Sequence, residues 1–506
     1  MTGRKIIVTS AKEITSENLL PILKNAFSEH SENQWEIRYL RDYYRGKQDI
    51  LERTKTYRTE INNKIVENRA FEIVEFKKGY VFGEPVQFVR RGDCELTEED
   101  ENSPENTGVA ALNEYLQAEN KEAIDAQIAE DMHVCGTAFR LAFPKSTISE
   151  TEKFVDEAPF IIAAMDPEYT FIIYSNTPEC KPMLGVSYVQ NVDPVTGEES
   201  YEVKAYSDTR VFTIMSDTFD FKSERSNIEE KPNGVGGIPI IEYPLNPSRL
   251  GCFENVLSLL DALNNVASNR MDGVEQFIQS FIKFTNCEID SEDFERLKRD
   301  GALVIKGTPG LPADADIMAS SLDQTQTQAL VDELYQAVLT ICGVPDREAS
   351  AGGNTGQALK IGQGWANAET RAKATEVIFK RSERQFLKII LGILHSIKPE
   401  RLPKGLAELR LSDIDFVFTR NNTDSLLVKT QGLLNLLDAG IHPRIAIEKV
   451  GLFSDPERVY QDSVELLDNR WKSQITTKGA AVPANNQPED GEKLEDDPDS
   501  AAQVNS

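Results

Sequence analysis

Apolar residues spaced three or four positions apart mark three long helices in the second half of the chain. Val256 and Leu260 begin the first of these series, which predicts a helix over residues 254–284. At 1.5 Å per residue such a helix is about 45 Å long. Similar spacing predicts a second helix over residues 322–341 and a third, the longest, over residues 357–397. The first two bracket residues 285–320, so we expect a small insert carried on a pair of helices.

The first 132 residues also show mainly helical spacing. A hydroxyl at Thr15 or Ser16 is a suitable N-cap, and a long helical stretch is expected from about residue 35 through DYYRGKQDILER. Further helices are predicted over residues 60–78, with Gly79 as the C-terminal cap, and over residues 108–132. The string GYVFGEPVQFV predicts two short strands around a turn at Gly83.

Between residues 136 and 243 the spacing changes to that of strands. Segments such as GTAFRLAF, YTFIIYS and SYEVKAYS are short, rich in β-branched and aromatic residues, and separated by turn residues. A mostly antiparallel β region is therefore predicted, closed by a glycine-rich turn at residues 233–239. Within the insert we expect a helix over residues 291–299 and a strand over residues 302–306. A strand is predicted near residue 415, and helices follow to about residue 467.

Charge changes the picture of possible partners. The 506-residue chain has 83 acidic and 55 basic residues, a net charge of −28. Proteins that grip duplex DNA neutralise its phosphates with basic side chains, so this composition argues against tight DNA binding. No stretch is apolar enough to span a membrane, and the N-terminus lacks the pattern of a secretory signal, so a cytoplasmic origin is expected.

Residues that could support catalysis or hold a cofactor or metal are scattered. The six cysteines and four histidines form no zinc-type spacing, and GGNTGQALK lacks the GK[ST] element of a phosphate-binding loop. Asp314 and Asp316 could touch a cation, although a solvated loop explains them better. We predict no catalytic residue, cofactor or metal. The dispersed carboxylates leave a metal-dependent DNA-processing enzyme as an alternative.

The long helix carries a local excess of basic residues. From residue 371 to residue 388 it has six basic side chains against Glu376 and Glu383. Two interpretations stand side by side: a contact with acidic neighbours in an oligomer, or a solvated face with local ion pairs.

Several strings, taken in order along the chain, resemble the portal proteins of tailed bacteriophages of the SPP1-type group. They cover roughly residues 35–470. The N-terminal strings are DYYRGKQDILERT and NNKIVENRAFEIVEFKKGYVFGEPVQF, and the β region adds MDPEYTFIIYSN and GIPIIEYPLN. NVLSLLDALNNVASNRMDGVEQF and GVPD…GGNTGQALK complete the series. No single string is diagnostic, but their order is characteristic.

The resemblance implies an α+β portal fold that assembles into a ring of about twelve subunits around a DNA channel. The expected domains are a wing (1–250), stem helix 1 (251–285), a clip (286–321), stem helix 2 (322–342), a tunnel loop (343–356), a long helix returning through the wing (357–420), a helical crown (421–471) and a disordered acidic tail (472–506).

The resemblance also implies partners and places candidate residues. The expected partners are double-stranded DNA, passing through without sequence-specific binding, the terminase large subunit, head-completion or adaptor proteins, and the major capsid and scaffolding proteins. The DNA-facing tunnel loop would comprise Val344, Pro345, Asp346, Arg347, Glu348, Ala349, Ser350, Ala351, Gly352, Gly353, Asn354 and Thr355. Partner-binding residues of the clip would be Glu292, Arg296, Arg299, Pro309, Leu311 and Asp314. Contacts between subunits would use Arg371, Lys380, Arg381 and Arg384.

One departure from the family pattern concerns the loop. Arg347 is its only basic residue and lies between Asp346 and Glu348, so a lysine that grips DNA is not evident. The leading interpretation is a non-enzymatic channel protein located at a capsid vertex of the virion. A monomeric scaffolding or adaptor protein is the third interpretation, beside the DNA-processing enzyme.

Overall fold

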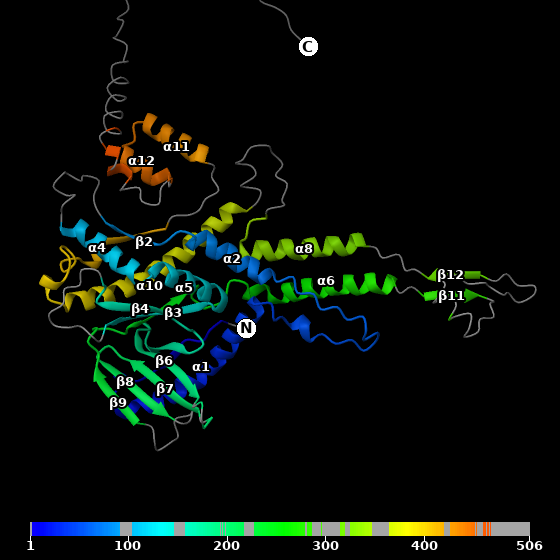
Figure 1. Ribbon diagram of the computed structural model, residues 1–506, viewed down its shortest axis with the longest axis horizontal. Helices are drawn as coiled ribbons and strands as arrows, with labels where there is room; N and C mark the ends of the chain where they lie inside the picture. Colours follow the sequence, from blue (N-terminus) through cyan, green and yellow to red (C-terminus); the bar gives the residue numbers. More distant parts are fainter. Residues whose placement is uncertain are drawn as a thin grey trace, which may run out of the picture. The chain divides into compact units, whose positions relative to one another are not determined.

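The computed structural model describes most of the chain in two units, Met1–Asn421 and Asn422–Ser506 (Figure 1). The described residues are 3–91, 104–145, 157–216 apart from 193, 195 and 198, 227–278, 281–285, 295, 314–318, 324–346, 364–418, 426–450 and scattered positions between 452 and 466. Helices and strands are mixed in the first unit, which confirms the predicted α+β class.

A six-stranded sheet forms one layer of the first unit. Its strands, in spatial order, are β1 (Ile7–Thr9), β5 (Thr170–Ser175), β6 (Pro182–Val192), β7 (Glu199–Tyr206), β8 (Arg210–Ser216) and β9 (Asn227–Pro232). All neighbours are antiparallel except β1 and β5, which run parallel. Helix α1 (Ser16–Tyr44) covers one face, because its buried Leu19, Leu23 and Phe27 belong to the same core as the sheet residues Phe171 and Val186.

A second core forms around a three-stranded sheet, β10 (Ile240–Pro244), β3 (Thr137–Pro144) and β4 (Phe160–Met165). Helices α5 (Lys121–Cys135) and α10 (Trp365–His395) pack on this sheet. The other elements of this part are α2 (Arg69–Phe82), α4 (Pro104–Ala118), the short 3-10 helices η1 (Asp49–Glu52), η3 (Pro399–Arg401) and η4 (Leu411–Asp413), and the antiparallel strands β2 (Gln87–Arg90) and β13 (Ile414–Val417). The strand predicted near residue 415 is therefore confirmed.

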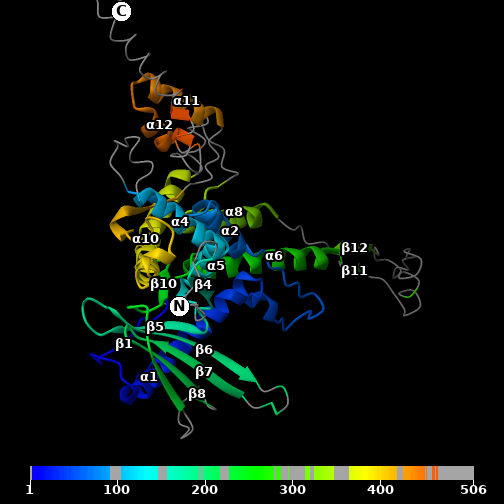
Figure 2. The ribbon, with the colours of Figure 1, turned by 60° about the vertical axis from the view of Figure 1, so that its left-hand side comes forward.

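Two helices lie side by side with a hairpin between them in the chain (Figures 1 and 2). Helix α6 (Leu257–Ile278) follows the short 3-10 helix η2 (Glu254–Val256), and α8 (Gln324–Cys342) returns. Strands β11 (Phe281–Thr285) and β12 (Asp314–Met318) pair antiparallel between the two helices. In the second unit, α11 (Leu426–Asp438) packs against α12 (Pro443–Val450).

Several predicted boundaries are wrong. The stretch from residue 35 is the second half of α1, which ends at Tyr44 because Gly46 takes the left-handed conformation (φ +91°). The helix predicted over residues 60–78 begins only at Arg69, and Gly79 lies inside α2, whose last turn replaces the first predicted strand. Residues 108–132 form two helices, interrupted at Asn120, which is also left-handed (φ +55°).

The helix predicted over residues 254–284 is shorter than expected. It ends at Ile278, and Phe281 belongs to β11 instead, because Phe281–Thr285 pairs with β12. The predicted helix over 291–299 and strand over 302–306 lie outside the described residues, apart from residue 295, which is helical. The tail from residue 472 also lies outside them.

Candidate functional site

Helices α6 and α8 form an antiparallel pair held by apolar contacts at one end. Leu260 and Leu263 of α6 share a buried core with Val338 and Leu339 of α8. Nearer the hairpin, Arg270 Nη1 donates a hydrogen bond to Gln328 Oε1 at 3.0 Å. The core therefore covers the first half of α6 and the second half of α8.

The apolar series continues beyond this core but is not covered there. Met271 and Val274 on α6 are 42% and 38% exposed, and Leu330 on α8 is 46% exposed. An amphipathic helix usually buries such residues against another element. The half of the pair next to the hairpin thus presents apolar side chains that no described residue covers.

The polar face of α6 is occupied by an irregular segment of the same chain, residues 61–68. Backbone N–H groups at alternating positions each donate to one side-chain oxygen per turn of α6: Asn63 to Asp272 (2.8 Å), Ile65 to Ser268 (2.9 Å) and Glu67 to Asn264 (2.9 Å). Backbone groups removed from water need partners, and here the helix side chains supply them. This explains why residues 60–68 are not helical.

Asp272 concentrates the charge of this contact. It forms ion pairs with Arg53, at 3.2 Å, and with Lys55, and it also accepts hydrogen bonds from the backbone and side chain of Asn63. Burial alone would raise the pKa of Asp272, but Lys55 and Asn63 outweigh it and lower the pKa. The carboxylate therefore stays ionised and paired at neutral pH.

Of the six predicted clip residues, the structure describes Asp314. Asp314 begins β12 and lies opposite Thr285 in the register, with Asp316 opposite Lys283. The other five, Glu292, Arg296, Arg299, Pro309 and Leu311, lie outside the described residues.

The base of the predicted tunnel loop is well defined. Gly343 ends α8 with φ +68°, and Val344 N–H donates to Leu339 O at 3.0 Å. Gln336 on α8 donates to Asp346 at 2.6 Å. Of the predicted loop residues, Val344, Pro345 and Asp346 are described and the remaining nine lie outside the described part.

Arg371 connects the long helix to the end of α8. Its Nη1 donates to Ile341 O at 2.6 Å, which satisfies a carbonyl at the helix C-terminus. A Cβ atom on Gly343 would lie only 2.4 Å from Arg371 Cδ. Both the glycine and the arginine are thus needed for this approach.

The other three predicted interface residues differ in their surroundings. Lys380 lies over the ring of Phe418, with Nζ 5.5 Å from its centroid. Arg381 and Arg384 are exposed, and among the described residues neither has a hydrogen-bond or ion-pair partner. The same holds for Lys388, one turn further along α10. These three form an exposed basic stripe on α10.

A buried ion cluster fixes α10 on the three-stranded sheet. Arg140 of β3 pairs with Glu383 of α10 at 2.6 Å and with Asp125 of α5, and Lys121 lies 3.4 Å from Glu383. Tyr243 donates to Glu383 at 2.7 Å. Burial would raise the pKa of Glu383, but Arg140 and Lys121 lower it. Sequence reasoning missed this cluster, since Tyr243 and Glu383 lie far along the chain from Lys121, Asp125 and Arg140.

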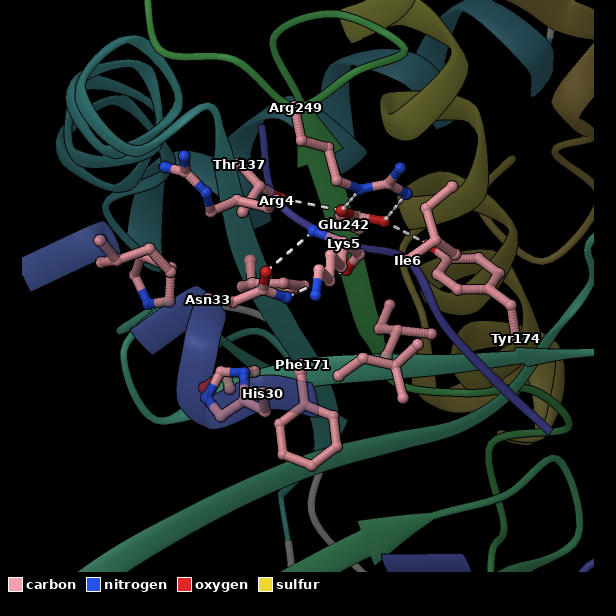
Figure 3. Close-up of a pocket in the computed structure, with 16 residues that line it drawn as sticks. Arg4, Lys5, Ile6, His30, Asn33, Thr137, Phe171, Tyr174, Glu242 and Arg249 are labelled. Atoms are coloured by element: carbon pink, nitrogen blue, oxygen red, sulfur yellow. Dashed lines mark hydrogen bonds and ion pairs between the residues drawn. The ribbon is translucent and has the colours of Figure 1, made fainter. Parts of the chain in front are cut away.

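A second missed cluster lies around the N-terminal segment, and Figure 3 shows its members Arg4, Glu242 and Arg249. Arg4 lines a small cavity of about 30 Å³, and its guanidinium donates to Cys135 O (3.2 Å) and pairs with Glu254 (2.7 Å). In the same region Arg249 donates twice to Glu242, at 2.5 and 2.8 Å. These charges are satisfied by one another, so the cluster is structural.

Two properties of the described residues bear on other classes of function. In that part of the chain no three His, Cys, Asp or Glu side chains gather as a metal-binding group. The described helices include none that is both long and apolar enough to cross a membrane.

Comparison with known proteins identifies one family. The family model described as phage portal protein, SPP1 Gp6-like, matches residues 23–474. No curated protein matches the chain.

Proposed function

Because the chain belongs to the SPP1 Gp6-like family of phage portal proteins, we propose that about twelve copies form a ring at one capsid vertex. DNA passes through the channel of this ring during packaging and ejection. The terminase large subunit docks on it during packaging, and head-completion or adaptor proteins replace the motor afterwards. The major capsid and scaffolding proteins surround it during assembly in the host cytoplasm. The ring itself performs no catalytic step.

The observation that carries this proposal is the paired helices with a hairpin between them. In the proposed assembly α6 and α8 form the stem, and the hairpin of β11 and β12 belongs to the clip that meets the motor and the head-completion proteins. The two sheets and their helices form the wing, and α11 and α12 the crown. The tunnel loop begins at Gly343, where α8 ends.

Exposed apolar residues on the stem support self-association. Met271 and Val274 of α6 and Leu330 of α8 leave an apolar surface on the half next to the hairpin. In a ring each stem has a neighbour on both sides, so these side chains would be buried against a second copy. Burial of apolar area is the main driving force of such contacts.

Charge supports a channel that lets DNA slide. Twelve copies at −28 sum to about −340, so carboxylates near the channel would repel phosphates. Because every subunit carries this negative charge, contacts between basic and acidic side chains of neighbouring subunits would stabilise the ring. We propose that Arg381 and Arg384 meet acidic groups of a neighbouring subunit. Arg371 and Lys380 already have partners within the chain, so we expect them to contribute less.

The test is the mass of the purified full-length protein by mass photometry, with negative-stain images. A ring of twelve 56.6 kDa chains has a mass near 680 kDa and a central hole. If a monomer is found, the measurement is repeated at high salt, which screens repulsion between subunits. A monomer that persists at every salt and protein concentration contradicts the proposal and favours the monomeric adaptor.

A further inference from the structure

A cavity of about 330 Å³ lies at the base of the tunnel loop, between α2, the end of α8, α10 and the segment before α6. Among the described residues that line it, Lys77 and Arg371 are cations and none is a carboxylate. In a chain with 83 acidic residues, a cavity whose described charged groups are both cations is a marked local reversal of charge.

Lys77 is half-buried, and no described acidic residue pairs with it. Among the described residues its ammonium group makes no ion pair or hydrogen bond. The next residue is different, since Lys78 pairs with Glu75 at 2.6 Å and with Glu130 at 3.0 Å. A partly buried cation without a partner is costly, so a ligand that brings negative charge would be stabilised there.

Lys77 lines the cavity, and its charge acts on three neighbouring groups. Burial, with a smaller contribution from Lys77, lowers the pKa of His133 to about 4. Burial raises the pKa of Cys252 to about 12 and that of Cys342 to about 11, while Lys77 acts against both shifts. All three groups line the cavity. They are neutral at pH 7, so the charge at the cavity comes from Lys77 and Arg371.

Arg371 has N–H groups that are available to a ligand. Its Nη1 donates to Ile341 O and its Nε to Asn367 Oδ1 at 3.4 Å, which leaves Nη2 without a partner among the described residues. Guanidinium and ammonium groups are the common ligands of phosphate oxygens in proteins. Further polar groups come from Asn246, Asn255 and Thr375, which also line the cavity.

We propose that this cavity binds a small phosphate-type oxyanion, with Lys77 and Arg371 as its charged ligands. Its volume accommodates inorganic phosphate with several waters, or a small phosphate monoester. A bound anion would join α2 to the junction of α8 and α10, directly beside Gly343. Phosphate could come from solution or from a nucleic-acid backbone, and the chemistry at the two cations is the same.

The full-length protein is titrated with inorganic phosphate. Binding is measured by calorimetry and by the change in the thermal unfolding midpoint. We expect saturable binding that Lys77→Met weakens by about tenfold or more, the loss typical of one charged hydrogen bond, and that Lys77→Arg retains. Lys24→Met is the matched control, since Lys24 is exposed on α1 and makes no described contact. It should bind phosphate as the wild type does.

A second variant keeps the proposal testable if Lys77→Met misfolds. Ala374 is exposed on α10 and lines the cavity, so Ala374→Glu should abolish phosphate binding by repulsion. Ala366→Glu, on the exposed part of the same helix but outside the cavity lining, is its control. Absence of phosphate binding to the wild type at millimolar concentration overturns the proposal, and so does wild-type affinity in both Lys77→Met and Ala374→Glu.

A competition arm distinguishes the two sources. If short duplex DNA displaces phosphate at an equal concentration of phosphate groups, the natural ligand is a backbone phosphate. If only phosphate and phosphate monoesters compete, the ligand is a small solute. Should Lys77→Met instead prevent ring formation while phosphate has no effect on the wild type, a carboxylate of a neighbouring subunit fills the cavity, and the proposal is wrong.

Discussion

Arg140 of β3 and Glu383 of α10 are both fully buried, and Arg140 Nη1 donates to Glu383 Oε1 at 2.6 Å. The two residues are 243 positions apart in the chain. Because Tyr243 and Lys121 also contact Glu383, the carboxylate holds α10 at one rotation on the sheet. The opposite side of the helix is then the one that presents Arg381 and Arg384 to solvent.

Replacing Glu383 with glutamine should destabilise the first unit strongly. Removing the charge of one partner in a buried ion pair typically lowers the unfolding free energy by about 3–5 kcal/mol, since the other charge is left uncompensated. The measurement is denaturant unfolding followed by circular dichroism. Glu29→Gln, at an exposed position on α1, is the control and should change stability by less than about 0.5 kcal/mol. Equal stability of Glu383→Gln and wild type would mean that the cluster is not needed.

The same pair predicts a dependence on pH. The pKa of Glu383 is lower in the folded protein than the ordinary value, which is about 4.3 in the unfolded chain. Its contribution is therefore complete above pH 5 and is lost as the pH falls through the lowered folded value. The difference in unfolding free energy between wild type and Glu383→Gln should shrink below about pH 4. A difference that stays constant down to pH 2 contradicts the assignment.

Gly343→Ala should weaken the junction of α8 and α10. The residue has φ +68°, which costs a non-glycine residue about 1 kcal/mol, and its new Cβ would press on Arg371. We expect a loss of about 1–2 kcal/mol in unfolding free energy. Gly234→Ala is the control, because that glycine has open space around it and no positive φ. In an Arg371→Ala background the cost should fall, as only the backbone part remains.

Asp272→Ala should release the segment that lies on α6. It leaves Arg53, Lys55 and the Asn63 amide without their shared acceptor, which we expect to cost about 2–3 kcal/mol locally. Hydrogen exchange of residues 53–67 should accelerate by about tenfold or more, and trypsin should cleave there first. Asn265→Ala, an exposed neighbour on α6, should leave both readouts unchanged.

The double variant Arg381→Glu/Arg384→Glu should prevent ring assembly without unfolding the chain. Both side chains are exposed on α10, so the change acts on contacts with other subunits rather than on the core. Mass photometry should show monomers where the wild type forms rings. Lys12→Glu/Lys24→Glu makes the same change in net charge elsewhere and should still assemble. Normal rings in the first variant would show that the basic stripe is a solvated face.

Local spacing predicted the elements whose cause is local. The series from Val256 to Leu263 predicted the start of α6, and the hydroxyl at Thr15 predicted the start of α1. Ile61 and Ile65 led to the wrong prediction of a helix from residue 60, because their spacing fits a helical period. The backbone around them is instead hydrogen-bonded to side chains of α6. The prediction that Gly79 caps this helix was wrong, because a glycine with open space around it is tolerated inside a helix.

Contacts between distant residues left no local signal. The pairing of Arg140 with Glu383 joins elements separated by more than two hundred residues. From the sequence alone, each of these residues is predicted to be an exposed charged side chain. The role of Arg371 was equally hidden, since its partner is a backbone carbonyl of another helix. The excess of basic residues on the long helix was visible, but which of them are engaged within the chain depends on the neighbours that folding supplies.

The segment on α6 also bears on how this helix responds to force. Three consecutive turns of the helix are each bonded to the irregular segment alongside, at Asn264, Ser268 and Asp272. A helix supported in this way resists bending and axial rotation, because either motion breaks several of these bonds together. Load applied at the hairpin end of α6 would then pass along the helix, with little loss, into the core that it shares with α8.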